Sequence, residues 1–415
     1  MRGIIIVAVV AIGLPACQSL VSRDDRVGPV PVTDLVDRQS AGDRVPVLDV
    51  RVIESVSDQS PAVVRASVKG PASFNVLVLS GGGAYGAYSA GVLAGWSEAG
   101  TRPKFDVVTG VSTGALVATL AFLGPARDPD LRKFYTRVTD KDIYARRSDL
   151  AAVFSDSLAD SKPLARLIEA TVGPELLREV AAEHAKGRRL YVGTTHLDGR
   201  RLVVWDMGAI AARGRPADLA LFRRVLLASA AIPGFFPPVP IPIEVDGKVY
   251  EEFHVDGGVT ASVFFRPPQV PRERLAALGD RPLAGSNLYV IVAGKLFSDP
   301  APVARRLLPI AESAISALLY SQTRGDLFQL YALCLSTGMN YRLSAVPADV
   351  PVPDDATSFN PVEMTRLFET GRERARAGTL WRSTPPGTQS GEEVPIRGGI
   401  RLATSPAESS QRKPR

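Results

Sequence analysis

The sequence predicts an α/β fold built on a mostly parallel sheet, because strand, turn and helix follow one another twice within about fifty residues. The first unit runs from an apolar strand at 74–79 into a helix at 87–98. The second runs from an apolar strand at 105–108 into an apolar helix at 115–123. Strands this apolar are typical of a parallel sheet that helices cover on both faces.

The rest of the chain supplies further helices and strands for such a fold. Alternating apolar and charged residues over 126–186 predict a helical layer. Two hairpins are expected, one around Asp198-Gly199 and one around Asp246-Gly247. The other expected elements are a possible short strand at 45–52, strands at 253–255 and 288–292, and helices at 217–230, 303–333 and 363–377.

Composition excludes several classes of protein and function. The chain has 415 residues, of which 45% are hydrophobic and 22% charged, as in a folded globular protein. The net charge of +6 is spread along the chain without a dense basic stretch, so no nucleic-acid partner is expected. Two Cys and three His without metal-ligand spacing argue against a zinc site, and we expect no metal and no cofactor.

The N-terminus reads as an export signal. Residues 4–14 form an apolar run that is too short to span a bilayer and fits a signal-peptide core. The following Leu14-Pro15-Ala16-Cys17 resembles the bacterial lipobox. This resemblance implies that residues 1–16 are removed, that Cys17 is lipidated, and that Gln18 directs the protein to the periplasmic face of the outer membrane. An ordinary signal peptide with an incidental cysteine is the alternative.

The expected domain boundaries follow from these features. After the signal peptide, residues 17–73 are expected to be a spacer and residues 74–300 the catalytic domain. Residues 301–382 are expected to be a C-terminal helical extension. Residues 383–415, rich in Pro, Gly, Ser, Arg and Glu, are expected to be a disordered tail. The oligomeric state is not legible from the sequence.

The most informative motif is a GxSxG, Gly110-Val111-Ser112-Thr113-Gly114, placed between an apolar strand and an apolar helix. A serine at such a turn has its hydroxyl exposed at the edge of the sheet, near a helix N-terminus that favours negative charge. The small residues Gly110 and Gly114 prevent clashes at the turn. Ser112 is therefore a candidate nucleophile, with a purely structural turn as the rival interpretation.

A glycine-rich loop, Gly81-Gly82-Gly83-Ala84-Tyr85-Gly86, follows the first strand. Consecutive glycines let backbone N–H groups point into one concavity, where they could hold an oxyanion. The spacing Gly81-x-Gly83-x-x-Gly86 also matches a dinucleotide fingerprint, with Asp106 twenty residues after Gly86 as the acid. However, Asp106 opens its strand, whereas a ribose-binding acid should end it. We therefore favour the oxyanion interpretation over the dinucleotide one.

The third motif, Asp256-Gly257-Gly258, follows a short apolar strand. Alone it would be an ordinary turn, but a serine nucleophile needs a base. His184 lies in a charged helix and His196 at a hairpin turn. His254 alternates with Asp256, so both would face the same side of a strand, and His254 is the rival base.

Together these motifs resemble the patatin-like phospholipase family, whose Gly-rich loop, GxSxG and DG[AG] occur in this order. The segment Ala228–Pro238 is also similar to that family. The resemblance implies a three-layer α/β/α fold with a mostly parallel sheet and a Ser–Asp dyad of Ser112 and Asp256. It also implies an oxyanion hole from Gly81, Gly82, Gly83 and Ala84. The motif glycines are Gly86, Gly110, Gly114, Gly257 and Gly258.

The implied activity is hydrolysis of lipid carboxylic esters, in the manner of a phospholipase A or lysophospholipase, through a covalent acyl-enzyme. Many relatives carry Arg or Lys where Tyr85 stands, so a preference for phospholipids over neutral esters is open. Segments 235–238 and 264–265 could line an acyl groove, although core packing is the default. The competing interpretation is a non-enzymatic envelope lipoprotein with a degenerate hydrolase fold.

Overall fold

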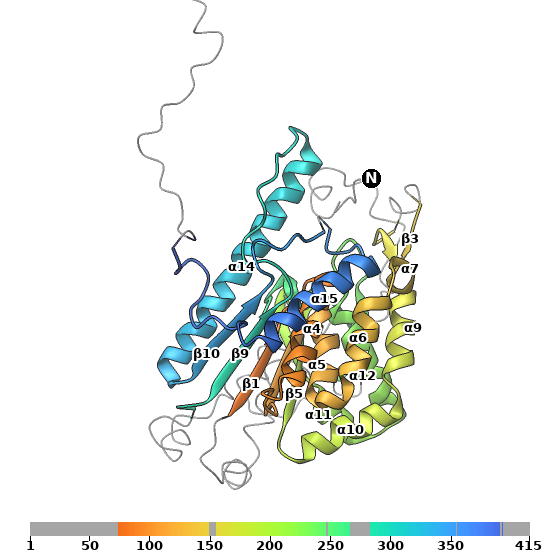
Figure 1. Cartoon of the computed structure of the whole chain (residues 1–415). Coiled ribbons are helices and arrows are strands. Elements are labelled where there is room, and N and C mark those ends of the chain that lie inside the picture. Colours follow the sequence, from red (N-terminus) through yellow and green to blue (C-terminus); the bar gives the residue numbers. More distant parts are fainter. Residues whose placement is uncertain are drawn as a thin grey trace, which may run out of the picture.

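An eight-stranded mixed sheet forms the centre of the computed structural model (Figure 1). The structure describes residues 74–148, 155–245, 248–265, 283–353, 355–390 and 392. The strands run in the order β10-β9-β1-β2-β5-β8-β7, with β6 paired to β5 outside this path. Neighbours from β10 to β5 pair in parallel, whereas β6, β8 and β7 join through antiparallel pairs. The strands are β1 (Asn75–Leu79), β2 (Val107–Val111), β5 (Arg189–His196), β6 (Arg201–Asp206), β7 (Val239–Val245), β8 (Lys248–Asp256), β9 (Asn287–Val292) and β10 (Asn340–Ala345).

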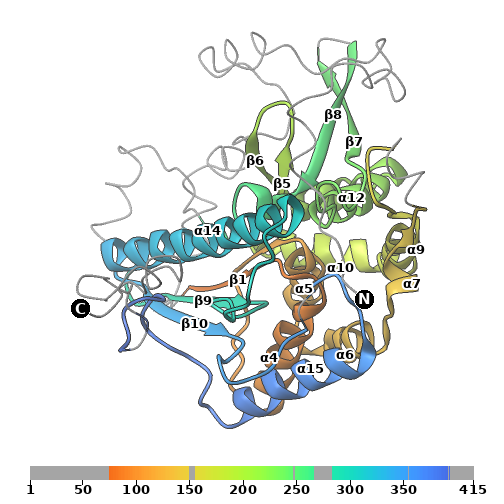
Figure 2. The same cartoon turned by 90° about the horizontal axis from the view of Figure 1, so that it is seen from above.

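Alternation along β1 separates two hydrophobic cores. Leu77 and Leu79 pack into the larger core, and Val76 and Val78 pack into a second core on the other face. Successive side chains of a strand point to opposite faces, so a strand apolar at every position requires cover on both sides. The result is a three-layer α/β/α arrangement, and the fold class predicted from the sequence is confirmed (Figure 2).

The two faces of the sheet are covered by very different numbers of helices. The second core is closed by one long helix, α14 (Leu307–Thr337), through Leu327, Leu330 and Cys334. The other face carries the remaining long helices (Figures 1 and 2). These are α4 (Gly86–Glu98), α5 (Thr113–Leu123), α6 (Asp128–Arg137), α9 (Lys162–Thr171), α10 (Pro174–Ala185), α11 (Met207–Arg213), α12 (Pro216–Ser229) and α15 (Pro361–Arg376). No helix in the described ranges is long and apolar enough to cross a membrane.

The helical layer expected at 126–186 is present but contains more than helices. It holds α6, α9 and α10, the short helix α7 (Asp140–Ile143) and a two-stranded sheet of β3 (Ala145–Arg146) and β4 (Ala159–Asp160). Two residues are too few to show the alternation of apolar and polar side chains by which a strand is recognised in a sequence, so β3 and β4 were not predicted. Both predicted hairpins form, as β5–β6 and β7–β8.

The boundary predicted at residue 300 is wrong, because residues 301–382 are not a separate helical extension. Strand β10 lies in this segment and pairs in parallel with β9 at the edge of the main sheet. Helix α15 packs lengthwise against α4 on the opposite face. A six-residue strand with one exposed face is a weak periodic signal, so the segment was expected to be helical throughout.

The predicted start of a disordered tail at residue 383 is too early. Arg382 exchanges backbone hydrogen bonds with Leu343 of β10 at 2.8 and 2.9 Å. Its guanidinium pairs with Glu392 at 2.7 Å, and Pro385 is buried. The predicted signal peptide, lipidated Cys17, spacer (including the possible strand at 45–52) and the chain beyond residue 392 lie outside the described residues.

Three glycines allow α4 and α15 to approach closely. A Cβ atom on Gly91 would lie 1.9 Å from the Phe368 carbonyl oxygen, and one on Gly95 would lie 2.1 Å from that of Arg372. From the other helix, a Cβ on Gly371 would lie 2.5 Å from the Tyr88 carbonyl oxygen. Because α4 follows the glycine-rich loop directly, this contact fixes the helix that begins at that loop.

We predict that Gly91→Ala destabilises the protein although alanine favours helix formation. The new methyl group must push α15 away, which should lower the free energy of unfolding by about 2 kcal/mol or more. The control is Gly325→Ala in α14, where a Cβ meets nothing within 4 Å. That substitution should leave stability unchanged or raise it by up to about 1 kcal/mol. Urea unfolding of both variants measures the difference, and equal midpoints would contradict the packing argument.

Candidate active site

Ser112 lies at a sharp turn between β2 and α5. Its φ of 56° and ψ of −130° are rare for a residue with a side chain. The two glycines of the motif make the turn possible by close approach. A Cβ on Gly110 would lie 2.3 Å from the Gly114 carbonyl oxygen, and one on Gly114 would lie 2.5 Å from that of Ser80. The strained turn places Ser112 at the N-terminus of α5, where the helix dipole favours negative charge.

Ser229 holds this turn in place from the end of α12. The Ser112 backbone N–H donates to the Ser229 hydroxyl at 2.9 Å, and that hydroxyl donates to the Gly193 carbonyl of β5 at 2.7 Å. The side chain of Ser229 is completely buried. Ser229 lies in segment 228–238, which resembles the patatin-like phospholipase family, but no role was predicted for it. The one feature that could have pointed to a role is a serine among the apolar residues at the end of this helix.

Asp256 ends β8 and meets Ser112, the candidate nucleophile. Its carboxylate accepts hydrogen bonds from the Ser112 hydroxyl and from the Gly258 backbone N–H, the latter at 2.7 Å. Burial raises the pKa of the Asp256 carboxyl to about 6, and the two hydrogen bonds oppose part of that rise. A Cβ on Gly257 would lie 2.5 Å from the Gly193 carbonyl oxygen, so this glycine lets β8 approach β5. The 144 residues between Ser112 and Asp256 are thus folded back as expected.

The glycine-rich loop lies against the nucleophile. A Cβ on Gly81 would lie 2.9 Å from that of Ser112. Gly82 and Gly83 have positive φ values of 152° and 53°, and their backbone N–H groups have no hydrogen-bond partner among the described residues. They remain candidate oxyanion donors. At the far end of the loop, a Cβ on Gly86 would lie 2.4 Å from the Thr113 hydroxyl oxygen.

The structure corrects the prediction for Ala84. Its N–H donates to the Ala356 carbonyl at 2.8 Å, so it is not free to hold an oxyanion. The neighbouring Tyr85 hydroxyl donates to the Pro353 carbonyl. This cover comes from the segment between β10 and α15, more than 250 residues away in the chain. The contact was beyond sequence reasoning because the segment has no periodic pattern.

The rival base His254 is committed elsewhere. Its Nδ1 lies 2.9 Å from the Thr194 hydroxyl, and its Nε2 lies 3.1 Å from the Glu252 carboxylate. The ring also stacks on His196, with centroids 5.2 Å apart. His254 is completely buried among these groups, and Asp256 is the group that hydrogen-bonds with the Ser112 hydroxyl.

The geometry also disfavours a dinucleotide site. The Asp106 carboxylate accepts the Asn75 N–H at 2.8 Å, at the amino end of β1. The glycine-rich loop follows the carboxyl end of β1, so the acid and the loop lie at opposite edges of the sheet. A ribose-binding acid would have to lie at the same edge as the loop.

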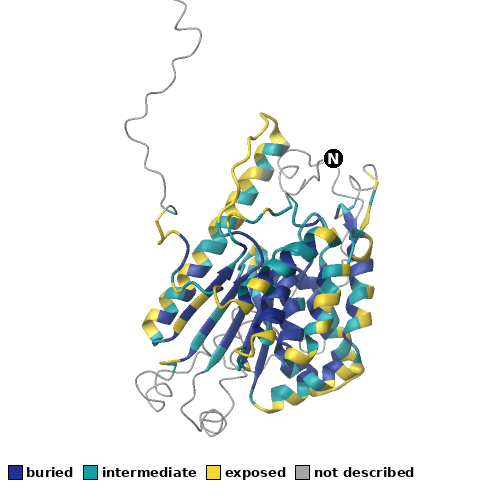
Figure 3. Cartoon of the chain, viewed as in Figure 1, coloured by how far each residue is buried: buried dark blue, intermediate teal, exposed yellow. Residues whose placement is uncertain are grey.

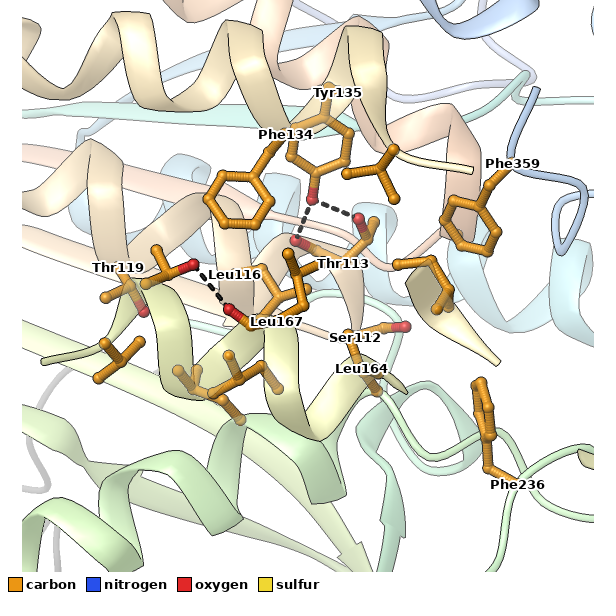
Figure 4. Close-up of a pocket in the computed structure, with 18 of the residues that line it drawn as sticks. Ser112, Thr113, Leu116, Thr119, Phe134, Tyr135, Leu164, Leu167, Phe236 and Phe359 are labelled. Carbon is orange, nitrogen blue, oxygen red and sulfur yellow. Dashed lines mark hydrogen bonds between the residues drawn. The ribbon is translucent and has the colours of Figure 1, made fainter. Parts of the chain in front are cut away.

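An apolar pocket opens at Ser112 and runs along α5 into the helical layer (Figure 4). Leu116 and Thr119 of α5 face Leu164 and Leu167 of α9 across it. No charged side chain lines the pocket among the described residues. The other lining residues are Gly83, Thr113, Leu120, Phe134, Tyr135, Val138, Ile143, Ile168, Thr171, Val172, Leu176, Leu226, Ala230, Ile232, Phe235, Phe236, Thr357, Phe359 and Met364.

The two segments expected at an acyl groove behave differently. Phe235 and Phe236 line the pocket, while Phe264 and Phe265 are buried in the cores beside the sheet. Tyr135 was not singled out in the sequence. Its hydroxyl lies 2.6 Å from that of Thr113 and fixes the residue after the nucleophile.

Comparison with known families agrees with the resemblance seen in the motifs. A family model described as patatin-like phospholipase matches residues 77–268. This part of the chain, slightly less than half of it, is similar to a patatin-like phospholipase domain. The match includes Ser112, Asp256 and the glycine-rich loop, and the family supports lipid hydrolase activity. No curated protein matches the chain.

Three solved structures are similar to this chain at low identity. VipD from Legionella pneumophila is 14% identical with a TM-score of 0.37, and the match covers 75% of this chain and 68% of VipD. The type III effector ExoU is 13% identical with a TM-score of 0.29. Full-length ExoU from Pseudomonas aeruginosa, in complex with SpcU, is 15% identical with a TM-score of 0.31. Each ExoU match covers 73% or 74% of this chain and 52% of the other, so this chain spans about half of the ExoU length.

We predict that the buried carboxyl of Asp256 costs stability at neutral pH. Its folded pKa of about 6 exceeds the ordinary value, so the folded protein binds this proton more tightly than the unfolded chain. Its contribution to the free energy of unfolding therefore falls as pH rises from about 4 to 6. Asp256→Asn should raise the free energy of unfolding by about 2–3 kcal/mol at pH 7 and change it little at pH 4.

Urea unfolding at the two pH values measures this gain. The stability of the Asp256→Asn variant should still depend on pH to some extent, because burial also raises the pKa of Asp206 to about 6. A gain of the same size at pH 4 and pH 7 would contradict a raised pKa for Asp256.

Proposed function

We propose that this protein is a serine acyl hydrolase that cleaves carboxylic esters of lipids through a Ser112–Asp256 dyad and a covalent acyl-enzyme. The observation that carries the proposal is the hydrogen bond between the Ser112 hydroxyl and the buried Asp256 carboxylate, at the end of an uncharged pocket. A nucleophile, its base and an apolar binding space are the parts that acyl transfer from a lipid ester requires.

In the first step, Ser112 Oγ attacks the ester carbonyl carbon as Asp256 accepts the hydroxyl proton. The N–H groups of Gly82 and Gly83 hold the resulting oxyanion, with the α5 dipole adding to the stabilisation. The tetrahedral intermediate collapses, the carbon–oxygen ester bond breaks, and Asp256 returns the proton to the departing alcohol or lysolipid. The acyl group stays on Ser112.

In the second step, Asp256 takes a proton from a water whose oxygen attacks the acyl carbonyl carbon. The bond between that carbon and Ser112 Oγ then breaks, Asp256 returns the proton to Oγ, and the fatty acid leaves. The raised pKa suits both steps. A pKa of about 6 brings Asp256 closer to the pKa of the serine hydroxyl than an ordinary aspartate would be, which makes it a stronger base. The carboxyl nevertheless remains mostly ionised at pH 7. No charged group other than Asp256 itself is needed for the proton transfers.

The pocket favours an acyl chain as the part of the substrate that is buried. It extends along α5 from Ser112 to Leu120, about 12 Å of helix, between side chains that are nearly all apolar. A charged headgroup would have to lie outside it. This agrees with phospholipase A or lysophospholipase chemistry and also admits neutral esters, since Tyr85 replaces the basic residue of many relatives.

Attachment to the outer membrane through a lipidated Cys17 is a separate proposal. It would hold the enzyme at a lipid surface on the periplasmic side, where its substrates are. Cys17 lies outside the described residues, so the proposal rests on the lipobox-like sequence alone.

We predict that Ser112→Ala and Asp256→Asn each reduce hydrolysis of a short-chain nitrophenyl ester by about 1,000-fold or more. Wild-type kcat/KM should rise with pH and level off above about 6, because Asp256 must be ionised to accept the proton. A fluorophosphonate probe should label Ser112, as located by mass spectrometry of the modified peptide.

The matched control is Asp206→Asn. Asp206 is also buried with a pKa raised to about 6, but its carboxylate accepts the Ala209 N–H at the start of α11. This variant should keep probe labelling and most activity. Activity that survives both Ser112→Ala and Asp256→Asn would overturn the dyad. A folded wild-type protein that neither labels nor hydrolyses would support the non-enzymatic interpretation.

We predict that the far part of the pocket measures acyl length. Leu164 lies beside Ser112 and Leu167 lies farther along α9, so Thr171 on the next turn lies deeper (Figure 4). Thr171→Phe should fill this part and reduce hydrolysis of a hexadecanoyl ester about 10-fold, while hydrolysis of a butanoyl ester stays unchanged. An equal loss for both esters would place the acyl chain elsewhere.

A further inference from the structure

Helix α14 is far longer than the strand that follows it. Its 31 residues span about 46 Å, whereas the six residues of β10 span about 20 Å. The helix ends where β10 begins, and β10 runs parallel to β9, β1 and β2. The first half of α14 therefore extends beyond the carboxyl ends of these strands, on the edge of the sheet that carries Ser112 (Figure 1).

This projecting half has no contact with the core. From Leu307 to Asp326, no residue whose burial the structure describes is buried, and the first buried one is Leu327 (Figure 3). Leu307 and Leu318 are 66% and 69% exposed. Soluble proteins rarely leave apolar helix turns in water unless another surface covers them.

Several apolar residues of this half lie on one face. Leu307, Ile310, Ala311, Ala314 and Leu318 follow the i, i+3, i+4, i+7, i+11 spacing, which brings them together on one side of an α-helix. Ser313, Ser316 and Tyr320 lie on the other side. Leu319, which is 46% exposed, lies about 100° farther around the helix, so the exposed apolar surface extends beyond this face.

The base of the projecting half is attached to the loop that follows Asp256. The Gln322 side-chain amide donates to the Gly258 carbonyl at 3.3 Å, and the Asp326 carboxylate accepts the Ser262 N–H at 2.7 Å. A surface that covers the apolar face would consequently be held beside the dyad.

The charges at this end suit an anionic surface. Arg305 and Arg306 are exposed directly before the helix. Glu312 is the sole acidic residue in the sequence from Leu307 to Arg324. Basic residues beside an apolar helix face are typical of helices that lie at a membrane surface, where they meet anionic headgroups.

We propose that Arg305, Arg306 and the first turns of α14 (residues 307–321) form an interfacial segment, whose helix inserts its apolar face between the headgroups of an anionic lipid surface and brings the carboxyl edge of the sheet to that surface. This proposal rests on the proposed function, since a lipid hydrolase must take its substrate from such a surface. A second copy of this chain is the competing occupant, but the two exposed arginines and the location beside the dyad favour lipid.

The test uses the full chain with Cys17→Ser, to prevent lipidation, and Ser112→Ala, to prevent substrate turnover. Sedimentation with vesicles of equimolar phosphatidylcholine and phosphatidylglycerol measures binding. Leu307→Gln with Leu318→Gln should weaken binding about 10-fold or more. The control is Phe328→Gln with Leu335→Gln, 46% and 67% exposed on the other half of the same helix, which should bind like the parent.

Charge is tested separately. Arg305→Gln with Arg306→Gln should weaken binding to the anionic vesicles and leave binding to pure phosphatidylcholine vesicles unchanged. In chains that retain Ser112, all three double variants should hydrolyse a soluble butanoyl ester at the parental rate, because none touches the dyad.

Equal vesicle binding by Leu307→Gln/Leu318→Gln and by the control Phe328→Gln/Leu335→Gln would overturn the proposal. The proposal would also be overturned if Leu307→Gln/Leu318→Gln converted a dimer into a monomer without changing vesicle binding. That result would show that a second copy of the chain covers the apolar face. Failure of the proposed function is distinguishable, because it would appear as absent ester hydrolysis in the parent whatever the vesicles show.

Discussion

The turn between β2 and α5 holds Ser112 in a backbone conformation that its side chain disfavours, and every group at the site is placed relative to that turn. Gly110 and Gly114 let strand and helix come together closely enough to make the turn. The Ser229 hydroxyl then holds the Ser112 amide, because it accepts a hydrogen bond from that N–H and donates one to a carbonyl of β5. Tyr135 holds Thr113 by a hydrogen bond between the two hydroxyls. Strain of this kind persists only where the surroundings determine the backbone completely.

Burial of Asp256 is the second constraint, and under the proposed function it exchanges stability for reactivity. A carboxyl withdrawn from water is harder to ionise, which raises its pKa and makes it a stronger base. The same withdrawal destabilises the fold at neutral pH. Natural active sites commonly carry such a loss of stability, because the group that would relieve it would also remove the function.

Much of this could be predicted from the sequence, because the strand–turn–helix units around Ser112 and the glycine loop are local patterns. The hydrogen bond from Ser112 to Asp256 could be inferred only through the family resemblance, since no periodicity measures a distance across 144 residues. Strand β10 was missed because its one exposed face gives a weak signal. Ala84 was assigned wrongly because its partner, the Ala356 carbonyl, lies in a segment without any pattern.

The hydrogen bond from Ala84 to Ala356 joins the beginning of the described chain to its end. Since β10 and α15 also belong to the same body, the glycine loop is braced by residues synthesised some 270 positions later. Contacts of such separation form late in folding, after the costly closure of a long loop. A nascent chain that has emerged only as far as β9 therefore contains Ser112 and the glycine loop, but not yet the segment that braces this loop.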